Sequence, residues 1–547
     1  MGCPAVMSLT NHALFFRDQT TSAQLEPISK TILALPMFSL RSSLAAATLG
    51  LMASLLAAPA AAEDSTLSVA SGKPPLTFNY STPSRDSTNW VGIYNPYFGA
   101  PDNGKWVARS LAWEYAPDSK GSVQVSASNL EPGTYNAYLL AKNEWGKLAG
   151  PIDVVVPGQG AMSFIVQNFT TQNARAGDKF EAKVKGLIDN QPDANTKFAK
   201  VASEGDVASN WVQVSTDGML SGTPNADGET RVTVEATGSN GSKAQLKVKI
   251  PVRKTGSPMV DELGVLSFNI WMGGSNVNDS HRKHVRYLSG TGVDIVGFQE
   301  SNGGQATRLG QALGWNAWQG PDVGIISRYP IAEVFPATAV AGAVRVALDG
   351  EESQVIVWNA HLGFNPYGPY DFCFDKKSVD QVLQREKDSG RTGQIVEIVD
   401  RMKGQIANAD KVPVVLTGDF NSPSHLDWTE ATRNIHCNVG NVPWPSSEEP
   451  TKAGMIDSFR EMHPDPLAEA GNTWSPIFLQ NENRPEPMDR IDFVYHKGLK
   501  TLDSKTEVVG QPKAEPNHKD NEWTSDHAAV KTIFRVDSRR ARRAFRG

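Results

Sequence analysis

Residue types suited to phosphoryl and metal chemistry stand at the ends of apolar runs in the second half of the chain. In the clearest case, the apolar run 412–416 predicts a buried strand. Gly418 ends this strand, so Asp419 and Asn421 follow it two residues apart. A carboxylate and a carboxamide at this spacing can hold a water molecule and a phosphoryl oxygen together. The alternative is an ordinary turn, because Asp, Asn and Gly are common turn residues.

Polar residues of the same kind end or follow other apolar runs in this region. They are Asn269, Glu300, His361, Asp492 and the pair Asp526 and His527. Each of them alone could be a strand-end cap or a hydrogen-bonded structural histidine. Their recurrence at one strand end after another favours a shared active site.

The elements that must position these residues alternate between strands and helices. Apolar runs predict strands at 265–271, 293–300, 322–330, 355–362, 412–416, 490–495 and 524–530. Amphipathic segments predict helices at 281–290 and 378–405. This alternation is typical of α/β and α+β domains.

In chain order the motifs read FNI, FQE, NAHL, GDFN, RIDFVY and SDH. They occupy 268–270, 298–300, 359–362, 418–421, 490–495 and 525–527. As a set they match those of the endonuclease/exonuclease/phosphatase superfamily, and region 262–536 resembles its members. The resemblance implies the fold of pancreatic-type deoxyribonuclease. This fold is a four-layer α/β sandwich with two mainly antiparallel sheets face to face, helices outside and the active site at one edge.

The resemblance also implies a metal site. The oxygen ligands Glu300 and Asp526, with Asn269 nearby, suit a hard divalent ion, Mg²⁺ above all, with Mn²⁺ or Ca²⁺ as alternatives. Such an ion would polarise a phosphoryl oxygen and offset charge on the leaving group. Zinc is disfavoured, because the region shows no Cys/His spacing like that of zinc sites. Three histidines considered as candidates lack carboxylate-bearing motifs: His281, His284 and His425.

The resemblance assigns proton transfer and charge stabilisation to further residues. His527, oriented by Asp492, is expected to be the general base for the attacking water, which Asp419 would position. His361 and Asn421 are expected to donate hydrogen bonds to non-bridging phosphoryl oxygens. No motif marks the carboxylate that would orient His361.

The segment after His361, residues 363–374, is aromatic and contains two prolines. Tyr367 and Tyr370 are expected to bind substrate there, by stacking on a base or sugar or by lining a slot; plain loop packing is the alternative. Cys373 and Cys437 are predicted to pair if the protein reaches an oxidising compartment. The alternative is two buried free thiols.

The expected activity is hydrolysis of phosphodiester or phosphomonoester bonds by water. Asp and Glu outnumber Lys and Arg in 262–536, whereas proteins that bind DNA without sequence specificity usually present a basic face. An extracellular nuclease acting on DNA or RNA is therefore an alternative that is not favoured. The other alternative is a non-catalytic adhesion or binding protein.

Two all-β modules are predicted ahead of this region, at 67–156 and 161–252. The first resembles immunoglobulin-like modules found beside some phosphoesterases. The second, with the turn LSGTP at 220–224, resembles cadherin-like or immunoglobulin repeats. Both are expected to be sandwiches that serve for spacing, adhesion or substrate presentation, with a surface glycan or protein as the partner in the case of adhesion. Core packing is preferred over a carbohydrate-binding face for the tryptophans of the first module, Trp90, Trp106, Trp113 and Trp145.

The N-terminal region predicts export. Residues 37–62 combine a short basic segment, an apolar stretch and three alanines before Glu63, as in a secretory signal peptide. The preceding 1–36 are interpreted as an over-long start, and the basic residues in 537–547 as a solvated tail. No later stretch is long and apolar enough to span a membrane. The mature protein is expected to be soluble, and periplasmic or extracellular.

Overall fold

The computed structural model describes residues 64–536, apart from 73–74, 97–100, 102–109, 127–129, 131 and 157–159. Segment 1–36, the predicted signal peptide 37–62, Trp106 and the tail 537–547 lie outside the described residues. Across the described ranges, none of the helices is both long enough and apolar enough to cross a membrane.

The first module consists of two sheets that share one buried cluster. The sheet β1-β2-β5 contains β1 (Thr66–Ser71), β2 (Leu76–Ser81) and β5 (Lys120–Val125). The sheet β4-β3-β6-β7 contains β3 (Trp90–Tyr94), β4 (Ala112–Tyr115), β6 (Gly133–Ala141) and β7 (Gly146–Val156). The module is therefore β-rich as expected, and its immunoglobulin-like identity stays a prediction.

One tryptophan of this module departs from the prediction of core packing. Trp90 is buried on β3, whereas Trp113 is 50% exposed. The reason is that Trp113 belongs to β4, which is the edge strand of its sheet.

The second module is also built from short strands. Its larger sheet has the order β10-β17-β16-β13, with β9 also paired to β17, and a smaller sheet has the order β11-β15-β14. The main strands are β9 (Asn168–Thr170), β10 (Ala174–Arg175), β11 (Phe180–Lys183), β13 (Lys197–Val201), β14 (Gln213–Val214), β15 (Met219–Gly222), β16 (Gly228–Thr237) and β17 (Lys243–Arg253). A further pair joins β8 (Ser163–Phe164) to β12 (Ile188–Asp189).

The second module shares its hydrophobic core with the domain that follows. One buried cluster contains Phe169 of the module together with Phe268 and Phe298 of that domain. Buried polar contacts join the same two parts: Arg175 pairs with Asp349 at 2.7 Å, and Arg328 donates to the Thr170 carbonyl at 2.7 Å. The module is thus packed against the domain and is not joined to it only through residues 253–262.

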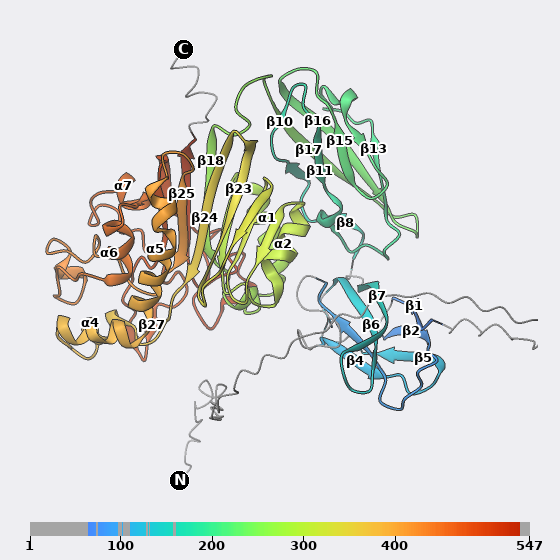
Figure 1. The fold of residues 1–547 in the computed structure, drawn as a ribbon, viewed down its shortest axis with the longest axis horizontal. Helices are drawn as coiled ribbons and strands as arrows, with labels where there is room; N and C mark the ends of the chain where they lie inside the picture. Colours follow the sequence, from blue (N-terminus) through green and yellow to red (C-terminus); the bar gives the residue numbers. More distant parts are fainter. Residues whose placement is uncertain are drawn as a thin grey trace, which may run out of the picture. The chain divides into compact units, whose positions relative to one another are not determined.

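The C-terminal domain contains two six-stranded sheets (Figure 1). The first has the order β20-β21-β19-β18-β31-β30. Its strands are β18 (Glu262–Asn269), β19 (Ile295–Gln299), β20 (Asn316–Gln319), β21 (Gly324–Ser327), β30 (Lys500–Glu507) and β31 (Ala529–Arg535). The second has the order β22-β23-β24-β25-β29-β26. Its strands are β22 (Ile331–Phe335), β23 (Ala341–Glu351), β24 (Ser353–His361), β25 (Val414–Asp419), β26 (Ile456–Asp457) and β29 (Asp492–Lys497).

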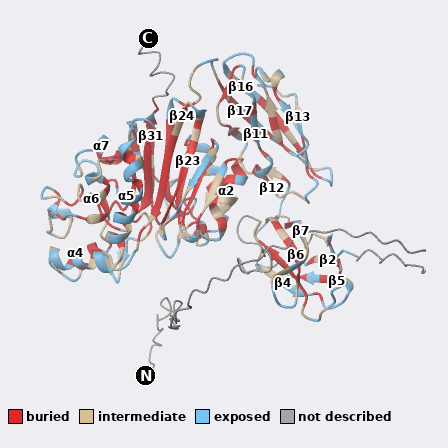
Figure 2. Ribbon diagram, viewed as in Figure 1, coloured by how far each residue is buried: buried red, intermediate tan, exposed pale blue. Residues whose placement is uncertain are grey.

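The contacts between buried apolar residues show how the sheets and helices of this domain are layered. Val265 and Ile325 of the first sheet share a buried cluster with Val357 and Val415 of the second, so the sheets pack face to face. Helices α1 (Ser280–Gly290) and α2 (Gln305–Leu313) cover the first sheet, and α5 (Arg391–Ala407) covers the second. Figure 2 shows the central strands buried between these helices. The expected order of helix, sheet, sheet and helix is therefore present.

Two local expectations were wrong in detail. The helix predicted at 378–405 is two helices, α4 (Val379–Asp388) and α5, because Gly390 has a φ of 85°. A left-handed residue cannot continue an α-helix. The aromatic segment after His361 contains a short helix, α3 (Gly368–Cys373), with Pro369 in its first turn. Further short helices are α6 (Pro445–Lys452) and α7 (Ser458–Met462).

Candidate active site

Strand direction and register bring the predicted residues to one edge of the sandwich. β18 and β19 run parallel, with Asn269 opposite Gln299, so Glu300 directly follows that pair. β24 and β25 also run parallel and end with His361 opposite Asp419. β29 is antiparallel to β25 and begins with Asp492 opposite Asp419. Carboxyl ends of parallel strands and amino ends of antiparallel neighbours meet at the same edge.

Asp419 lies at the centre of the site and is buried. Its Oδ2 accepts a hydrogen bond from Asn269 Nδ2 at 3.0 Å. The Nε2 atoms of His361 and His527 approach the same oxygen, at 3.6 and 3.7 Å. Two imidazoles from different sheets thus converge on one carboxylate, as expected where a water and a phosphoryl group are held together.

His527 is oriented by Asp492, as predicted. The imidazole Nδ1 lies 2.8 Å from Asp492 Oδ2, and both side chains are buried. Burial acts to lower the pKa of His527, but the Asp492 and Asp419 carboxylates raise it well above its ordinary value. With Nδ1 donating to Asp492, Nε2 is the nitrogen that faces the site.

The partner of His361, which the sequence did not reveal, is Asp322. Its Oδ2 lies 2.7 Å from His361 Nδ1. Burial acts to lower the pKa of His361, but Asp322 and the carboxylates of Asp419 and Glu300 raise it to about 9. Asp322 lies in the loop before β21, so the only local signal was a carboxylate just before an apolar run.

Asn421 follows the strand in a left-handed conformation, with a φ of 49°. Its backbone N–H donates to Asp419 Oδ1 at 2.8 Å, which fixes that carboxylate. Its side-chain Nδ2 donates to the Leu362 carbonyl at 3.1 Å. The same Nδ2 also donates to Asp419 Oδ2 at 3.5 Å, so Asn421 lies beside Asp419, and its donation to a phosphoryl oxygen stays a prediction.

Of the three residues proposed to bind metal, Asp526 and Glu300 offer oxygens suited to a hard cation. Asp526 Oδ1 is buried, and no hydrogen-bond partner for it occurs among the described residues. Burial raises the pKa of Asp526 to about 7, because a charged carboxylate is costly in a buried position. A bound cation would offset this cost. Glu300 has a φ of 56°, and its Oε2 accepts from the Met272 N–H at 2.6 Å. Both carboxylates offer oxygens of the type that Mg²⁺ prefers.

Asn269 differs from the expected ligand arrangement. Its Nδ2 faces Glu300 Oε1 at 3.2 Å, while its Oδ1 accepts from the Trp271 N–H at 2.9 Å. As placed, Asn269 holds two carboxylates together through its amide donors. Asp419, Asp492 and His527 form a second, buried group whose possible ligand atoms lie within 4.8 Å of one another.

The segment that enters β29 is fixed by the arginine of the RIDFVY motif. Arg490 is buried and bonds to Asp427 at 2.9 Å and to Asp457 at 2.8 Å. A buried charge needs such partners, and their loss typically costs about 3–5 kcal/mol. Arg490 therefore positions Asp492 from behind and does not face the site.

Tyr367 and Tyr370 are half-buried, and their hydroxyl groups donate to acids that the sequence analysis missed. Tyr367 donates to Asp489 Oδ2 at 3.2 Å, and Tyr370 to Glu486 Oε1 at 2.7 Å. Trp474 Nε1 donates to the same Glu486 oxygen at 2.8 Å. The tyrosines thus belong to a bonded wall, and stacking on substrate stays a prediction.

The cysteine prediction is confirmed. Cys373, at the end of α3, forms a disulfide with Cys437. The bond joins the helix that carries Tyr370 to the segment after Trp428. None of the three histidines considered for zinc joins the one group of possible metal ligands found among the described residues.

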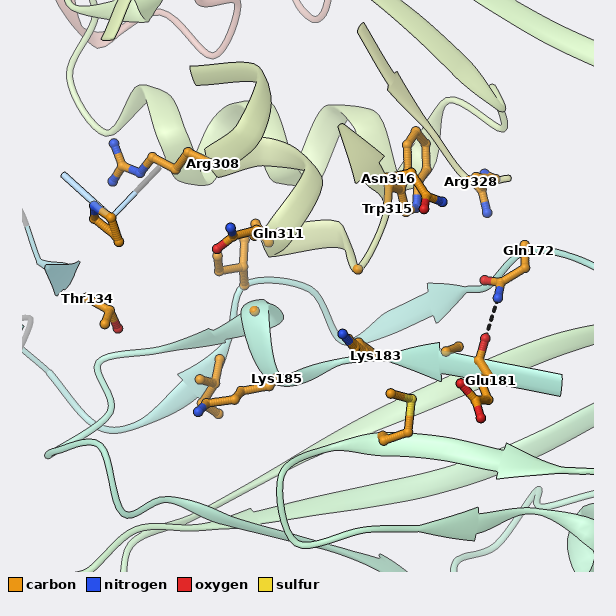
Figure 3. Close-up of a pocket in the computed structure, with 18 of the residues that line it drawn as sticks. Thr134, Gln172, Glu181, Lys183, Lys185, Arg308, Gln311, Trp315, Asn316 and Arg328 are labelled. Carbon is orange, nitrogen blue, oxygen red and sulfur yellow. Dashed lines mark hydrogen bonds between the residues drawn. The ribbon is translucent and has the colours of Figure 1, made fainter. Parts of the chain in front are cut away.

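A large cavity in the described part of the chain lies elsewhere (Figure 3). Lys183 and Lys185 of the second module and Arg308 and Gln311 of α2 contribute to its lining. We call the predicted residues at the strand ends the strand-end cluster: Asn269, Glu300, His361, Asp419, Asn421, Asp492, Asp526 and His527. None of these residues lines the cavity. This cavity is therefore not the candidate active site.

Comparisons with known proteins indicate the family of the C-terminal domain. A model of the Endonuclease/Exonuclease/phosphatase family matches residues 266–527. An uncharacterized protein of Caenorhabditis elegans, F14F9.5, is 34% identical over 285 residues, which are 49% of this chain and 89% of that protein. The match to truncated Caenorhabditis elegans TDP2 has 17% identity, a TM-score of 0.33, and covers 50% of this chain and 98% of the other. The human Nocturnin catalytic domain matches with 14% identity, a TM-score of 0.33, and coverage of 51% and 97%.

The two packed sheets and the strand-end cluster are those of an endonuclease/exonuclease/phosphatase-type domain. Through residues 266–527, the chain belongs to the endonuclease/exonuclease/phosphatase family.

Proposed function

We propose that this protein is an exported, divalent-metal-dependent hydrolase that transfers the phosphoryl group of a phosphodiester or phosphomonoester to water. The observation that carries the proposal is the approach of His361 Nε2 and His527 Nε2 to Asp419 Oδ2. An acid, a base and a water-positioning carboxylate within one small volume are what in-line attack on phosphorus requires. The signal-like segment 37–62 supports export.

In the proposed mechanism, Asp419 holds the attacking water, and the neutral form of His527 accepts the proton of this water at Nε2. Asp492 keeps the His527 ring in position and stabilises its protonated form. The imidazolium of His361, held by Asp322, donates to a non-bridging phosphoryl oxygen, where negative charge increases in the transition state.

Glu300 and Asp526 would hold the cation. Mg²⁺ bound there would polarise a phosphoryl oxygen and offset the charge on the leaving group. Asn269 would keep Glu300 and Asp419 in place through its amide, at 3.2 and 3.0 Å.

The test is hydrolysis of bis(p-nitrophenyl) phosphate and p-nitrophenyl phosphate by the full mature chain, with Mg²⁺ and with EDTA. Release of p-nitrophenol that depends on Mg²⁺ and is lost in His527→Ala supports the proposal. Glu333→Gln serves as the control, because Glu333 lies at the surface in an ion pair with Arg345 on β22 and β23, outside the site. Metal-independent turnover, or no turnover of any ester in a panel with DNA, RNA, inositol phosphates and sphingomyelin, would contradict it. The second outcome would favour the non-catalytic binding protein.

A further inference from the structure

An arc of aromatic rings borders the candidate site between His527 and Asn269. The Trp474 ring lies 5.0 Å from the His527 ring and 5.5 Å from that of Phe478. Phe478 lies 5.8 Å from Trp271, and Trp271 lies 5.0 Å from His518. We call Trp474, Phe478, Trp271 and His518 the aromatic arc. All four are partly exposed, so their faces can receive a ligand.

The aromatic arc is joined to the catalytic groups at both of its ends. The Trp271 N–H donates to Asn269 Oδ1, and the next residue, Met272, donates its N–H to Glu300. Ser475, next to Trp474, donates its hydroxyl to the Asp526 carbonyl at 2.7 Å. A group esterified to a phosphate in the site would therefore have aromatic faces directly beside it.

Apolar side chains extend this surface outward. Met272 is 56% exposed and Leu479 is 52% exposed. Leu479 precedes a small hairpin, β27 (Gln480–Asn481) and β28 (Arg484–Pro485), whose residues are mostly polar. A polar hairpin does not suit insertion into lipid, so the exposed apolar area favours contact with a small organic group.

The charges around the site are one-sided. Glu300, Asp322, Asp419, Asp492 and Asp526 supply carboxylates, and the tyrosine wall adds Asp489 and Glu486. Across the described residues, no lysine or arginine forms an ion pair or hydrogen bond with the five carboxylates of the site or with its two histidines. Proteins that bind polynucleotides neutralise neighbouring phosphates with such cations. A second phosphate, or the second charge of a monoester, would meet carboxylates that no lysine or arginine among the described residues offsets.

We propose that the substrate is a small phosphodiester with a single negative charge, whose uncharged, ring-bearing substituent stacks on the aromatic arc. This inference rests on the proposed hydrolase function. Trp271 and Phe478 are then specificity-determining residues, because they contact the substituent and not the phosphorus. Edge-to-face and offset contacts between rings supply about a tenfold gain for a ring over a methyl group.

The test compares phenyl p-nitrophenyl phosphate with methyl p-nitrophenyl phosphate. The two diesters share a leaving group and a charge and differ only in the substituent that stays on phosphorus. The parent protein should prefer the phenyl diester by at least about tenfold in kcat/KM. Trp271→Ala and Phe478→Ala should each reduce this preference to about twofold, mainly by raising KM for the phenyl diester. Val334→Ala is the matched control, because Val334 is 52% exposed on β22 and outside the arc.

Two further substrates test the charge argument. p-Nitrophenyl phosphate and the oligonucleotide (dT)12 should each be hydrolysed with a kcat/KM at least about tenfold below that of the phenyl diester. Equal rates for the phenyl and methyl diesters, an unchanged preference in both alanine variants, or preferred cleavage of the oligonucleotide would overturn the inference while leaving the hydrolase function intact. No hydrolysis of any ester would overturn both.

Discussion

Replacing Asp322 by asparagine tests the one catalytic contact that no sequence motif indicated. Asp322 Oδ2 lies 2.7 Å from His361 Nδ1, and the Asp322 side chain is 38% exposed. Asparagine keeps the size of the side chain but removes its negative charge. The His361 ring should then lose both its orientation and part of its preference for the protonated form.

The magnitude follows from the pKa of His361, which is raised from 6.5 to about 9 despite burial. That difference corresponds to about 3 kcal/mol, shared among Asp322, Asp419 and Glu300. Because Asp322 is more than one third exposed, solvent screens its contribution. We therefore expect Asp322→Asn to lower kcat by about 10–100-fold at pH 7, as for other residues that orient a catalytic histidine.

The dependence of the rate on pH shows in which direction the pKa of His361 changes. His361 donates through Nε2 only when protonated, so activity of the parent should fall as the pH rises through about 9. In Asp322→Asn the pKa of His361 should fall by at least about 1 unit, and the alkaline decline should begin at correspondingly lower pH. Initial rates with bis(p-nitrophenyl) phosphate from pH 5 to 10 measure both effects, with Glu333→Gln as the control. A variant within twofold of the parent and with the same alkaline limb would refute the assignment.

Four further predictions concern the metal, the proposed general base, the disulfide and a buried acid. Glu300→Gln should weaken metal binding, seen by calorimetry, and excess Mg²⁺ or Mn²⁺ should restore part of its rate. His527→Ala should lose about 10²–10⁴-fold in rate without rescue by metal. Rescue of His527→Ala by metal, together with no rescue of Glu300→Gln, would contradict both proposed roles. Replacing Cys373 and Cys437 by serine opens a loop of 64 residues and should lower the free energy of unfolding by about 2–4 kcal/mol; an unchanged melting temperature would contradict this. Burial raises the pKa of Asp489 from 3.8 to about 7. The folded state therefore binds a proton more tightly than the unfolded state, and stability falls as the pH rises from about 4 to 7. Asp489→Asn should remove up to about 3 kcal/mol of the decline between pH 5 and pH 8, measured by guanidinium unfolding at these two pH values, and an equal decline in both proteins would exclude Asp489 as its source.

The sequence by itself indicated the candidate site residues and much of the framework. Asn269, His361 and Asp419 each end an apolar run, and this pattern is local, so it can be read without the fold. The order of the motifs then indicated the family. The disulfide between Cys373 and Cys437 could also be predicted, because two cysteines of a chain expected to be exported have few other partners.

Local signals were weaker where a turn decides the structure. Gly390 divides the helix predicted at 378–405, because its left-handed φ of 85° stops α5 from continuing α4. The apolar periodicity continues across Ser389 and Gly390, so the pattern alone favoured one helix. Backbone freedom at a single glycine outweighed the periodic signal.

Only the tertiary structure decided which side chains meet. Asp322 is 39 residues from His361, and Glu486 is 116 residues from Tyr370. The aromatic arc likewise brings Trp271 next to Phe478. Such contacts depend on the order of the strands in each sheet and on their register. Both are set by pairing between strands that are far apart in the sequence, so no single segment reveals them. The same reason explains the shared core of the second module and the C-terminal domain. A strand's own sequence shows which of its faces is apolar, and the tertiary structure decides what covers that face.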